Sequence, residues 1–396
     1  MFQSVTLAPP DAILGLSEAF AKEPNPAKIN LSIGVFTDET GKTPVLKTVK
    51  EAERRLLEGE TSKSYLPIDG SPAYAQAVQA MMFGAGHEVI TSRRATTSHT
   101  PGGTAALRVA ADFIKRIFPK ATVWLPEPTW PNHPQIFEAA GVAVRTLPYF
   151  DAPSNSLAFD TMLAALGQVA SGDFVLLHGC CHNPSGIDPT PGQWRQIGAA
   201  LKDRGATALI DFAYQGFGRG LSEDAEGLLA LLQPEVEMLI CSSFSKNFGL
   251  YKERVGALTA VSKDAETAAR VQSQVKAVIR ANYSNPPSHG GAIVSTILGD
   301  AALRAQWEAE LAAMRDRING MRKLFVATLK AKGVPRDFSF IERQLGMFSF
   351  SGLSKEQVQK LRDQYAIYMV GNGRINVAGM RPATMDRLCE AIGSVM

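Results

Sequence analysis

The sequence has little of what marks secreted, membrane-spanning or nucleic-acid-binding proteins. Its 396 residues include only four cysteines, too few for a disulfide framework in a chain of this size. There is no apolar run of membrane-spanning length, and the first residues show no secretory signal. The 41 basic and 38 acidic residues nearly cancel and form no basic block, which argues against a nucleic-acid partner. We therefore expect a soluble cytoplasmic protein that acts on small molecules.

Two of the cysteines, Cys180 and Cys181, are adjacent and are flanked by His178 and His182. Adjacent side chains on a strand point to opposite faces, so these residues would not easily share one metal ion. Zinc sites also favour ligands that are spaced along the chain. We predict buried structural residues here and no metal site.

Apolar segments typical of strands alternate with helical patterns through the middle of the chain. The expected strands are 123–125, 142–146, 174–178, 208–211, 238–242 and 255–260. The expected helices are 104–117, 131–139, 159–166 and 193–202. This alternation indicates βαβ units, hence an α/β fold with a mostly parallel sheet flanked by helices. Ligands bind such sheets beyond the carboxyl ends of the strands.

The pattern changes after residue ~300, where a smaller α+β domain is expected. Its expected elements are a long helix over 301–331, strands at 347–350 and 374–377, and helices at 354–364 and 382–392. We expect a large domain of residues 45–315 and a small C-terminal domain of residues 316–396. Residues 1–44 would form an arm and part of the small domain.

A lysine flanked by hydroxyl groups follows one of the expected strands. Ser243, Ser245 and Lys246 lie just beyond the segment 238–242, and Arg254 follows eight residues after the lysine. The lysine amine could form a Schiff base, while the two hydroxyls and the guanidinium could bind a phosphate. Taken alone, the segment is more simply interpreted as a surface loop.

Polar groups also follow other expected strands. The segment 100–104, with Gly103 and Thr104, precedes a helix whose amides and dipole suit an anion. Asp211 ends a strand and could pair with a protonated pyridine nitrogen, although a helix N-cap is about as good an interpretation. Asn183 could be a donor or part of a simple turn. Arg374 begins a short C-terminal strand, and its guanidinium suits a carboxylate.

The combination of these segments resembles the class I pyridoxal-phosphate-dependent aminotransferases, and within them the bacterial aspartate and aromatic amino acid group. The most specific segment is SFSKNFGLYKERVG at residues 243–256. Further segments are DAILGL at 11–16, DETGKTPVL at 38–46, PGGT at 101–104, WPNH at 130–133, HGCCHNP at 178–184, DFAYQGF at 211–217, RANYSNPP at 280–287 and NVAGM at 376–380. The resemblance covers the whole chain. It implies a fold-type I transferase, a pyridoxal 5'-phosphate cofactor and a homodimer with shared active sites.

The resemblance also implies a role for each matching residue at the cofactor. Lys246 matches the lysine that forms the Schiff base and transfers protons. Asp211 matches the partner of the pyridine nitrogen, with Asn183 and Tyr214 at the phenolic oxygen and Trp130 stacked on the ring. The residues that match the phosphate site are Gly103, Thr104, Ser243, Ser245, Arg254 and, from the neighbouring subunit, Tyr65.

Further matches concern the amino acid and 2-oxo acid substrates. Arg374 matches the arginine that binds the α-carboxylate, helped by Gly34 and Asn183. Arg280 matches an arginine that crosses the subunit interface to bind a side-chain carboxylate. These matches imply ping-pong transfer of the amino group of aspartate, with the cofactor alternating between its pyridoxal and pyridoxamine forms.

Some positions leave the substrate range open. Lys252, Thr37 and Ser64 depart from the aspartate-selective pattern. Thr104 and Asn285 resemble aspartate-preferring members, whereas Ser64 and the Leu66-Pro67 step resemble aromatic ones. We expect aspartate as the better donor to 2-oxoglutarate, with phenylalanine and tyrosine also accepted. The alternatives are an enzyme acting mainly on aromatic amino acids, another enzyme of the same fold such as a decarboxylase or lyase, and a non-enzymatic regulator.

Overall fold

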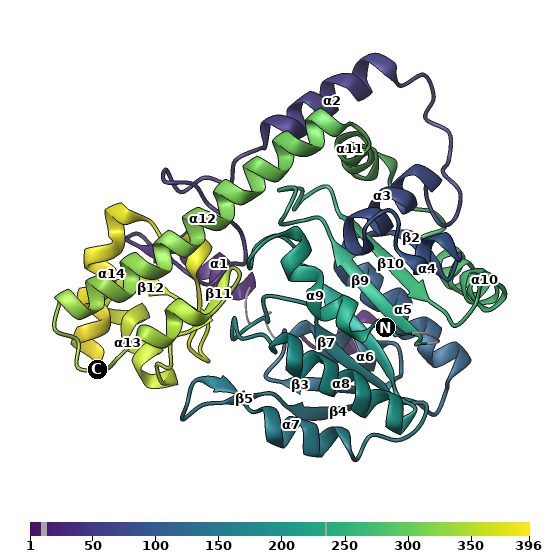
Figure 1. Cartoon of the computed structure of the whole chain (residues 1–396). Coiled ribbons are helices and arrows are strands. Elements are labelled where there is room, and N and C mark those ends of the chain that lie inside the picture. Colours follow the sequence, from purple (N-terminus) through teal and green to yellow (C-terminus); the bar gives the residue numbers. More distant parts are fainter. Residues whose placement is uncertain (9–13, 234–235) are drawn as a thin grey trace. The chain divides into compact units, whose positions relative to one another are not determined.

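The computed structural model describes residues 1–8, 14–233 and 236–396, and it divides the chain into two compact units (Figure 1). One unit is Met1–Thr43 with Arg317–Met396, and the other is Pro44–Asp316. Residues 11–13 of the segment DAILGL lie outside the described residues. No helix in the described ranges is long and apolar enough to cross a membrane.

The larger unit is built on a seven-stranded sheet in the order β2-β10-β9-β8-β7-β3-β4. These strands are β2 (Ala95–Pro101), β3 (Thr122–Glu127), β4 (Ala143–Pro148), β7 (Phe174–His178), β8 (Thr207–Phe212), β9 (Met238–Ser243) and β10 (Val255–Val261). Only β10 is antiparallel to its neighbours, and the remaining pairs are parallel. The prediction of an α/β fold with a mostly parallel sheet is therefore confirmed.

The sequence did not reveal β2, because this strand, ATTSHTP, is polar although nearly all of it is buried. Its polar groups find partners in neighbouring elements. Thr97 Oγ1 lies 2.8 Å from Thr259 Oγ1 of β10, and the Gln272 amide nitrogen donates to Ser98 Oγ at 3.1 Å. Buried polar groups are tolerated when they are hydrogen-bonded, so a buried strand need not be apolar.

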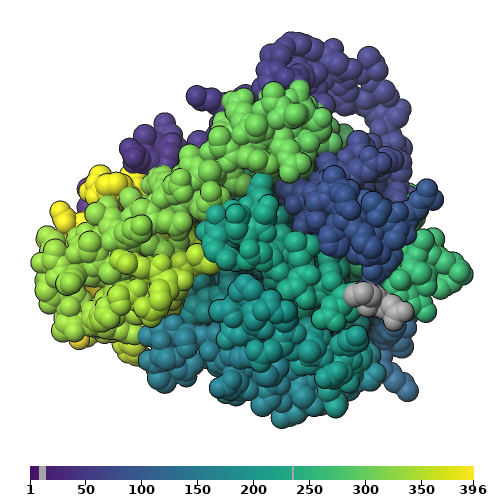
Figure 2. All heavy atoms as spheres, in the orientation of Figure 1, coloured from purple at the N-terminus to yellow at the C-terminus, as the bar shows by residue number. Residues whose placement is uncertain are grey.

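Helices cover this sheet, and several expected ones are found within one or two residues. They are α5 (Gly103–Ile117), α6 (Asn132–Ala139), α7 (Phe159–Leu166) and α8 (Pro191–Arg204). Helices that had not been expected are α2 (Lys47–Gly59), α3 (Pro72–Phe83), α4 (Glu88–Thr91), α9 (Leu221–Leu231), α10 (Ala265–Asn282) and α11 (Ser288–Gly299). Side chains fill the spaces between these ribbons (Figure 2).

Helix α5 matters most for the site because it begins directly after β2. Its residues Leu107, Ala110 and Ile114 recur at helical spacing and are fully buried. They belong to a core cluster that includes Leu239 of β9 and Leu258 of β10. This packing fixes the start of the helix, with its unpaired backbone N–H groups, at the edge where β2 ends.

The described residues of the smaller unit contain two short strand pairs and three α-helices beside part of α12 (Ala301–Ala331). Strand β1 (Ile29–Asn30) pairs in parallel with β12 (Ile367–Tyr368), and β11 (Phe348–Phe350) pairs antiparallel with β13 (Arg374–Asn376). The helices are α1 (Leu14–Lys22), α13 (Lys355–Tyr365) and α14 (Pro382–Val395). Helix α13 begins after Ser354, whose hydroxyl accepts from the Gln357 backbone in a capping box. The expected start at residue 354 is therefore the cap and not the first helical residue.

Candidate active site

The chemically active residues of the larger unit gather where its strands end. In the register of the sheet His178 lies opposite Asp211, and Asp211 lies opposite Cys241 on β9. On the other side of β9, Ser243 lies opposite Gly256 of β10, which lies opposite Thr100 of β2. The carboxyl ends of β2, β9, β8 and β7 therefore share one edge, as expected for the ligand site of such a sheet.

A group of hydrogen-bond donors lies at the junction of β2 and α5. Gly102 precedes α5 with φ 84°, and a Cβ atom there would lie 2.3 Å from Arg254 Nη2. The guanidinium therefore lies against the Gly102 backbone, which only glycine permits. Arg254 Nη1 donates to Ser245 Oγ at 3.3 Å and to the Tyr251 carbonyl at 3.0 Å, and Ser243 Oγ donates to Ser245 Oγ at 3.2 Å.

The first turn of α5 completes this cluster. Gly103 and Thr104 are its first two residues, and a Cβ on Gly103 would lie 3.0 Å from Ser243 Cβ. The helix start therefore adjoins the two serines and Arg254. Backbone N–H groups, hydroxyls and a guanidinium at a helix N-terminus form a site suited to a phosphate. The structure thus brings together the five residues of this chain that were predicted to bind phosphate.

Lys246 is half-buried in the turn that follows β9. Its Nζ lies 4.8 Å from the centroid of the Tyr214 ring. Burial lowers the pKa of Lys246 to about 8, an effect that Asp211 opposes and Arg254 reinforces. A lysine with a pKa of about 8 is roughly one-tenth free base at pH 7, far more than an ordinary lysine, and the free base is the form that a nucleophilic or proton-accepting amine requires. The surface-loop interpretation of this lysine is wrong.

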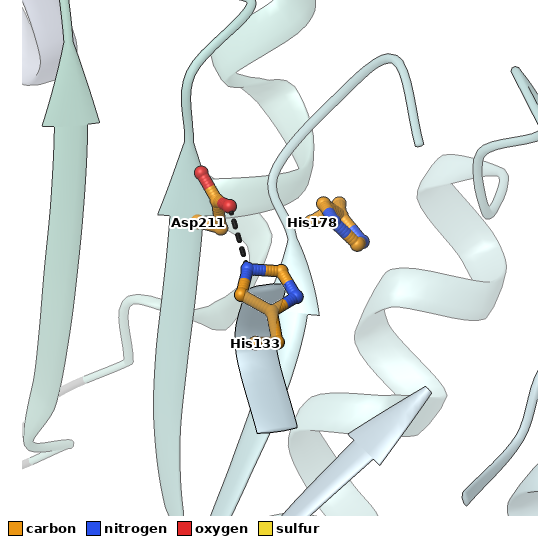
Figure 3. A group of neighbouring side chains, drawn as sticks. All are labelled: His133, His178 and Asp211. Carbon is orange, nitrogen blue, oxygen red and sulfur yellow. Dashed lines mark hydrogen bonds and ion pairs between the residues drawn. The ribbon is translucent and has the colours of Figure 1, made fainter. Parts of the chain in front are cut away.

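Asp211 is held by a buried histidine that the prediction had not included (Figure 3). His133 Nε2 lies 2.9 Å from Asp211 Oδ2, and its Nδ1 lies 2.7 Å from Thr129 Oγ1. Burial opposes ionisation of Asp211, but the hydrogen bond to His133 and the fields of His133, His178 and Lys246 lower its pKa below the usual value. The carboxylate is therefore charged at neutral pH. It lies within a strand rather than at a helix start, so the N-cap interpretation does not hold.

The other expected cofactor residues of the larger unit lie after neighbouring strands. Asn183 is buried in the turn after β7, and Tyr214 is buried two residues after the end of β8. Trp130 follows β3 and packs edge-on against His133, with ring centroids 5.2 Å apart. His133 was visible in the sequence as part of WPNH, but no local pattern indicated that it would bind Asp211.

Two expected residues are exposed in the single chain. The Tyr65 side chain is 91% exposed. Arg280 lies exposed in the last turn of α10 and hydrogen-bonds to Ser284. The structure of one chain therefore does not bring them to Lys246.

Within the smaller unit, Arg374 and Gly34 lie around the same aromatic ring. The Arg374 guanidinium lies over Phe348, 4.3 Å from the ring centroid, and its Nη2 donates to the Ser32 carbonyl at 2.6 Å. A Cβ on Gly34 would lie 2.8 Å from the tip of Phe348. The Asn376 side-chain amide donates to the carbonyls of Ile33 and Val35, which holds the segment around Gly34. These contacts fix the orientation of the Arg374 guanidinium.

The structure corrects the argument about the adjacent cysteines. Strand β7 ends at His178, and Cys181 has a left-handed φ of 52°. Strand alternation therefore does not apply, and the sulfurs of Cys180 and Cys181 and a carboxylate oxygen of Asp224 all lie within 4.8 Å of one another.

The aminotransferase class I and II family model matches residues 26–392 of the chain. The chain belongs to this aminotransferase family. Aspartate aminotransferases of Salmonella typhi and Escherichia coli (strain K12) are each 56% identical to it over 396 residues, with all of both chains covered. A crystal structure of an aromatic-amino-acid aminotransferase from Burkholderia pseudomallei, covalently bound to pyridoxal phosphate, superposes with a TM-score of 0.97 at 47% identity. That match covers 100% of this chain and 99% of the other. The aminotransferase therefore has the fold-type I architecture that the sequence predicted.

Proposed function

We propose that this aminotransferase transfers the amino group of L-aspartate to 2-oxoglutarate by a ping-pong mechanism with pyridoxal 5'-phosphate, and also accepts L-phenylalanine and L-tyrosine. The observation that carries the proposal is the edge of the sheet where Lys246, with a pKa of about 8, lies near an ionised Asp211 and the Arg254 cluster. The aspartate aminotransferases at 56% identity support aspartate as the preferred donor.

The residues at this edge fit pyridoxal phosphate. Ser243, Ser245 and Arg254, with the start of α5, match a phosphate in charge and donors. The Asp211 carboxylate matches a protonated ring nitrogen, and the Lys246 amine matches an aldehyde carbon. When bound, the cofactor supplies an electron sink for the negative charge that develops at the substrate's α-carbon.

Each residue then has a definite task in our proposal. Lys246 Nζ would hold the cofactor covalently, and its amine would accept and return the proton of the substrate's α-carbon. Asp211 would keep the ring nitrogen protonated, and its hydrogen bond to His133 holds the Asp211 carboxylate ionised and oriented. Asn183 and Tyr214 would hold the phenolic oxygen, and Trp130 would cover the ring.

Substrate recognition is assigned to two arginines. Arg374, fixed by Phe348 and the Ser32 carbonyl, would bind both oxygens of the α-carboxylate. Gly34 and Asn183 are assigned to the same substrate group by their match to the family. Arg280 binds the second carboxylate of aspartate or glutamate. Its exposure in the single chain supports the proposal that it acts in the partner's site.

We propose that the enzyme is a homodimer with shared sites, to which Tyr65 contributes at the partner's phosphate group. Its exposed side chain leaves it available for such a contact. We further propose that residues 45–315 form the cofactor-binding domain, and that residues 1–44 and 316–396 form the small domain. A cytoplasmic location is also proposed, supported by four buried cysteines that are not in disulfides.

The test is a panel of amino donors with 2-oxoglutarate as acceptor, with glutamate and the matching 2-oxo acid measured as products. Aspartate should give equal amounts of oxaloacetate and glutamate and the highest kcat/KM, followed by phenylalanine and tyrosine. Lys246→Ala should abolish turnover while the cofactor still binds noncovalently, because the covalent anchor and proton carrier are lost. Release of carbon dioxide from aspartate without glutamate would instead identify a decarboxylase. A higher kcat/KM for tyrosine than for aspartate would identify an aromatic enzyme.

A further inference from the structure

Two thiols and a carboxylate converge behind the turn that carries Asn183. Cys180 and Cys181 are 4% and 2% exposed, and their sulfurs lie within 4.8 Å of each other and of a carboxylate oxygen of Asp224. The left-handed conformation of Cys181 is what turns the two neighbouring side chains toward the same space. A non-glycine residue in this conformation persists only when surrounding contacts hold it.

Surrounding backbone groups hold both sides of the cluster in place. The Cys181 N–H donates to Asp188 Oδ2 at 2.6 Å. Asp224 Oδ2 accepts from the N–H groups of Gly216 and Gly218 at 2.8 and 2.9 Å, and Oδ1 accepts from that of Arg219 at 2.8 Å. Hydrogen bonds to a carboxylate of this kind orient ligands in metal sites.

Gly218 lies against both sides of the cluster. A Cβ atom on Gly218 would lie 2.6 Å from Asp224 Oδ1 and 3.2 Å from Cys181 Sγ. The carboxylate oxygen and the sulfur therefore both lie close to one point beside the Gly218 backbone, where only glycine fits. Oδ1 accepts from the Arg219 N–H, and a carboxylate oxygen has more than one lone pair, so it can also face a cation.

We propose that Cys180, Cys181 and Asp224 form a binding site for a soft divalent cation, such as Cd²⁺ or Zn²⁺. Two sulfurs and one carboxylate oxygen are ligands that Zn²⁺ takes, and three protein ligands leave one position for solvent. On binding, the two S–H bonds release their protons to solvent and two metal–thiolate bonds form, so no electron transfer is involved.

A metal ion bound at this site should displace residues that are assigned to the active site. The Cys181 thiol contacts the Tyr214 carbonyl at 3.9 Å, and Asn183 lies two residues after Cys181. A cation that displaces Cys181 would shift both neighbours, so bound metal should inhibit the enzyme. This inhibition rests on the proposed function, whereas the binding itself does not.

The test is a Cd²⁺ titration of the holoenzyme, followed by the ultraviolet charge-transfer band of cadmium–thiolate bonds and by metal analysis after gel filtration. We expect one tightly bound Cd²⁺ per chain, and an affinity that rises about a hundredfold per pH unit below the thiol pKa because two protons are released. Uptake should be slow because the thiols are buried. The double variant Cys180→Ser/Cys181→Ser should lose the band, while Cys241→Ser and Cys389→Ser, which remove the other two buried thiols, should keep it.

X-ray absorption of the wild-type complex keeps the proposal testable if the double variant fails to fold. It should show two sulfur ligands and at least one oxygen ligand. The proposal is overturned if the double variant binds Cd²⁺ as tightly as wild type, or if wild type shows the band only after unfolding in urea. Binding without loss of turnover would leave the site standing and refute its coupling to Asn183 and Tyr214.

Discussion

The two arginines assigned to the substrate's carboxylates differ sharply in their surroundings. Arg374 is 2% exposed and fixed by Phe348 and the Ser32 carbonyl, so its orientation is set before any substrate binds. Arg280 is exposed, and its hydrogen bond to Ser284 is local to one turn of chain. A rigid arginine suits the carboxylate that every amino acid carries, and a movable one suits a group that only some donors have.

Replacing Arg280 should therefore separate the donors. Arg280→Ala should lower kcat/KM for aspartate about a hundredfold, on the order of 3 kcal/mol, because the substrate's second carboxylate loses its partner. The value for phenylalanine should change only a few-fold. Arg270→Ala, on the same helix and paired locally with Glu266 and Thr267, is the matched control and should leave both donors unaffected. An equal loss for both donors in Arg280→Ala would mean that this arginine is structural.

At the scale of elements, the site depends on how two connections meet. The link from β2 to α5 places Gly102 and Gly103 against the side chains of Ser243 and Arg254, which flank the turn from β9 to β10. The two connections are about 140 residues apart in sequence and meet because β10 pairs with both β2 and β9. The phosphate site is thus a product of strand order.

Gly102 should be far more sensitive to substitution than a glycine of the same conformation elsewhere. Gly102 and Gly84 both have φ 84°, but a Cβ at Gly102 would lie 2.3 Å from Arg254 Nη2, whereas nothing lies within 4 Å at Gly84. Gly102→Ala and Gly84→Ala should each lower the free energy of unfolding by roughly 1–3 kcal/mol through backbone strain. Only Gly102→Ala should also weaken cofactor binding tenfold or more, because Arg254 must move. Urea unfolding measures the loss of stability, and titration of the apoprotein with the cofactor measures its affinity. Equal cofactor affinity in the two variants would refute the proposed contact.

At the scale of the whole molecule, buried imidazoles link stability to pH. Burial lowers the pKa of His99 to about 4, and burial is also the main cause that lowers the pKa of His178 to about 3. Between these values and the unfolded value near 6.5, the unfolded chain binds protons that the folded chain does not. Stability therefore rises with pH over this range and is lost as pH falls. Asp188, raised to about 6, acts in the opposite direction between 3.8 and 6.

The variant His99→Asn should make the unfolding free energy depend less on pH below about pH 6.5. Its unfolding free energy should fall less than that of wild type between pH 6.5 and 4, by up to about 3 kcal/mol for a group shifted by some 2.5 pH units. Urea unfolding of the apoprotein, at one protein concentration throughout, measures this difference. Above pH 7 the two proteins should show parallel pH dependence, whatever the packing cost of the substitution. Parallel curves below pH 6 as well would show that His99 does not titrate as its burial requires.

Shared sites can be tested by mixing two variants that each have little or no activity on aspartate. If Arg280 acts in the partner's site, a hybrid dimer of Lys246→Ala and Arg280→Ala subunits contains one site with both residues intact. Random reassortment should then restore about a quarter of wild-type activity on aspartate, since half of the dimers are hybrids with one working site each. If Arg280 acted in its own subunit, no hybrid site would be complete and the mixture would stay inactive. Unmixed variants treated in the same way are the control.

The sequence by itself determined the elements with strong local signals. Apolar segments in the larger unit predicted six of its sheet's strands, and helical spacing predicted α5 to α8 and α12, because these patterns repeat within a few residues. It also indicated that polar groups such as Lys246 and Asp211 would follow strands. Their proximity followed from a general property of parallel sheets and needed no knowledge of individual contacts.

Only the tertiary structure decided which residues that are distant in sequence form hydrogen bonds or clusters with one another. Strand β2 escaped detection because its polar side chains are satisfied by partners on β10 and α10, and the role of His133 depends on Asp211, 78 residues away. The convergence of Cys180 and Cys181 with Asp224 depends on one left-handed residue beyond the end of a strand. Periodicity reports which face of an element is apolar, but hydrogen bonds, shifted pKa values and ligand clusters arise from contacts that form when the chain folds.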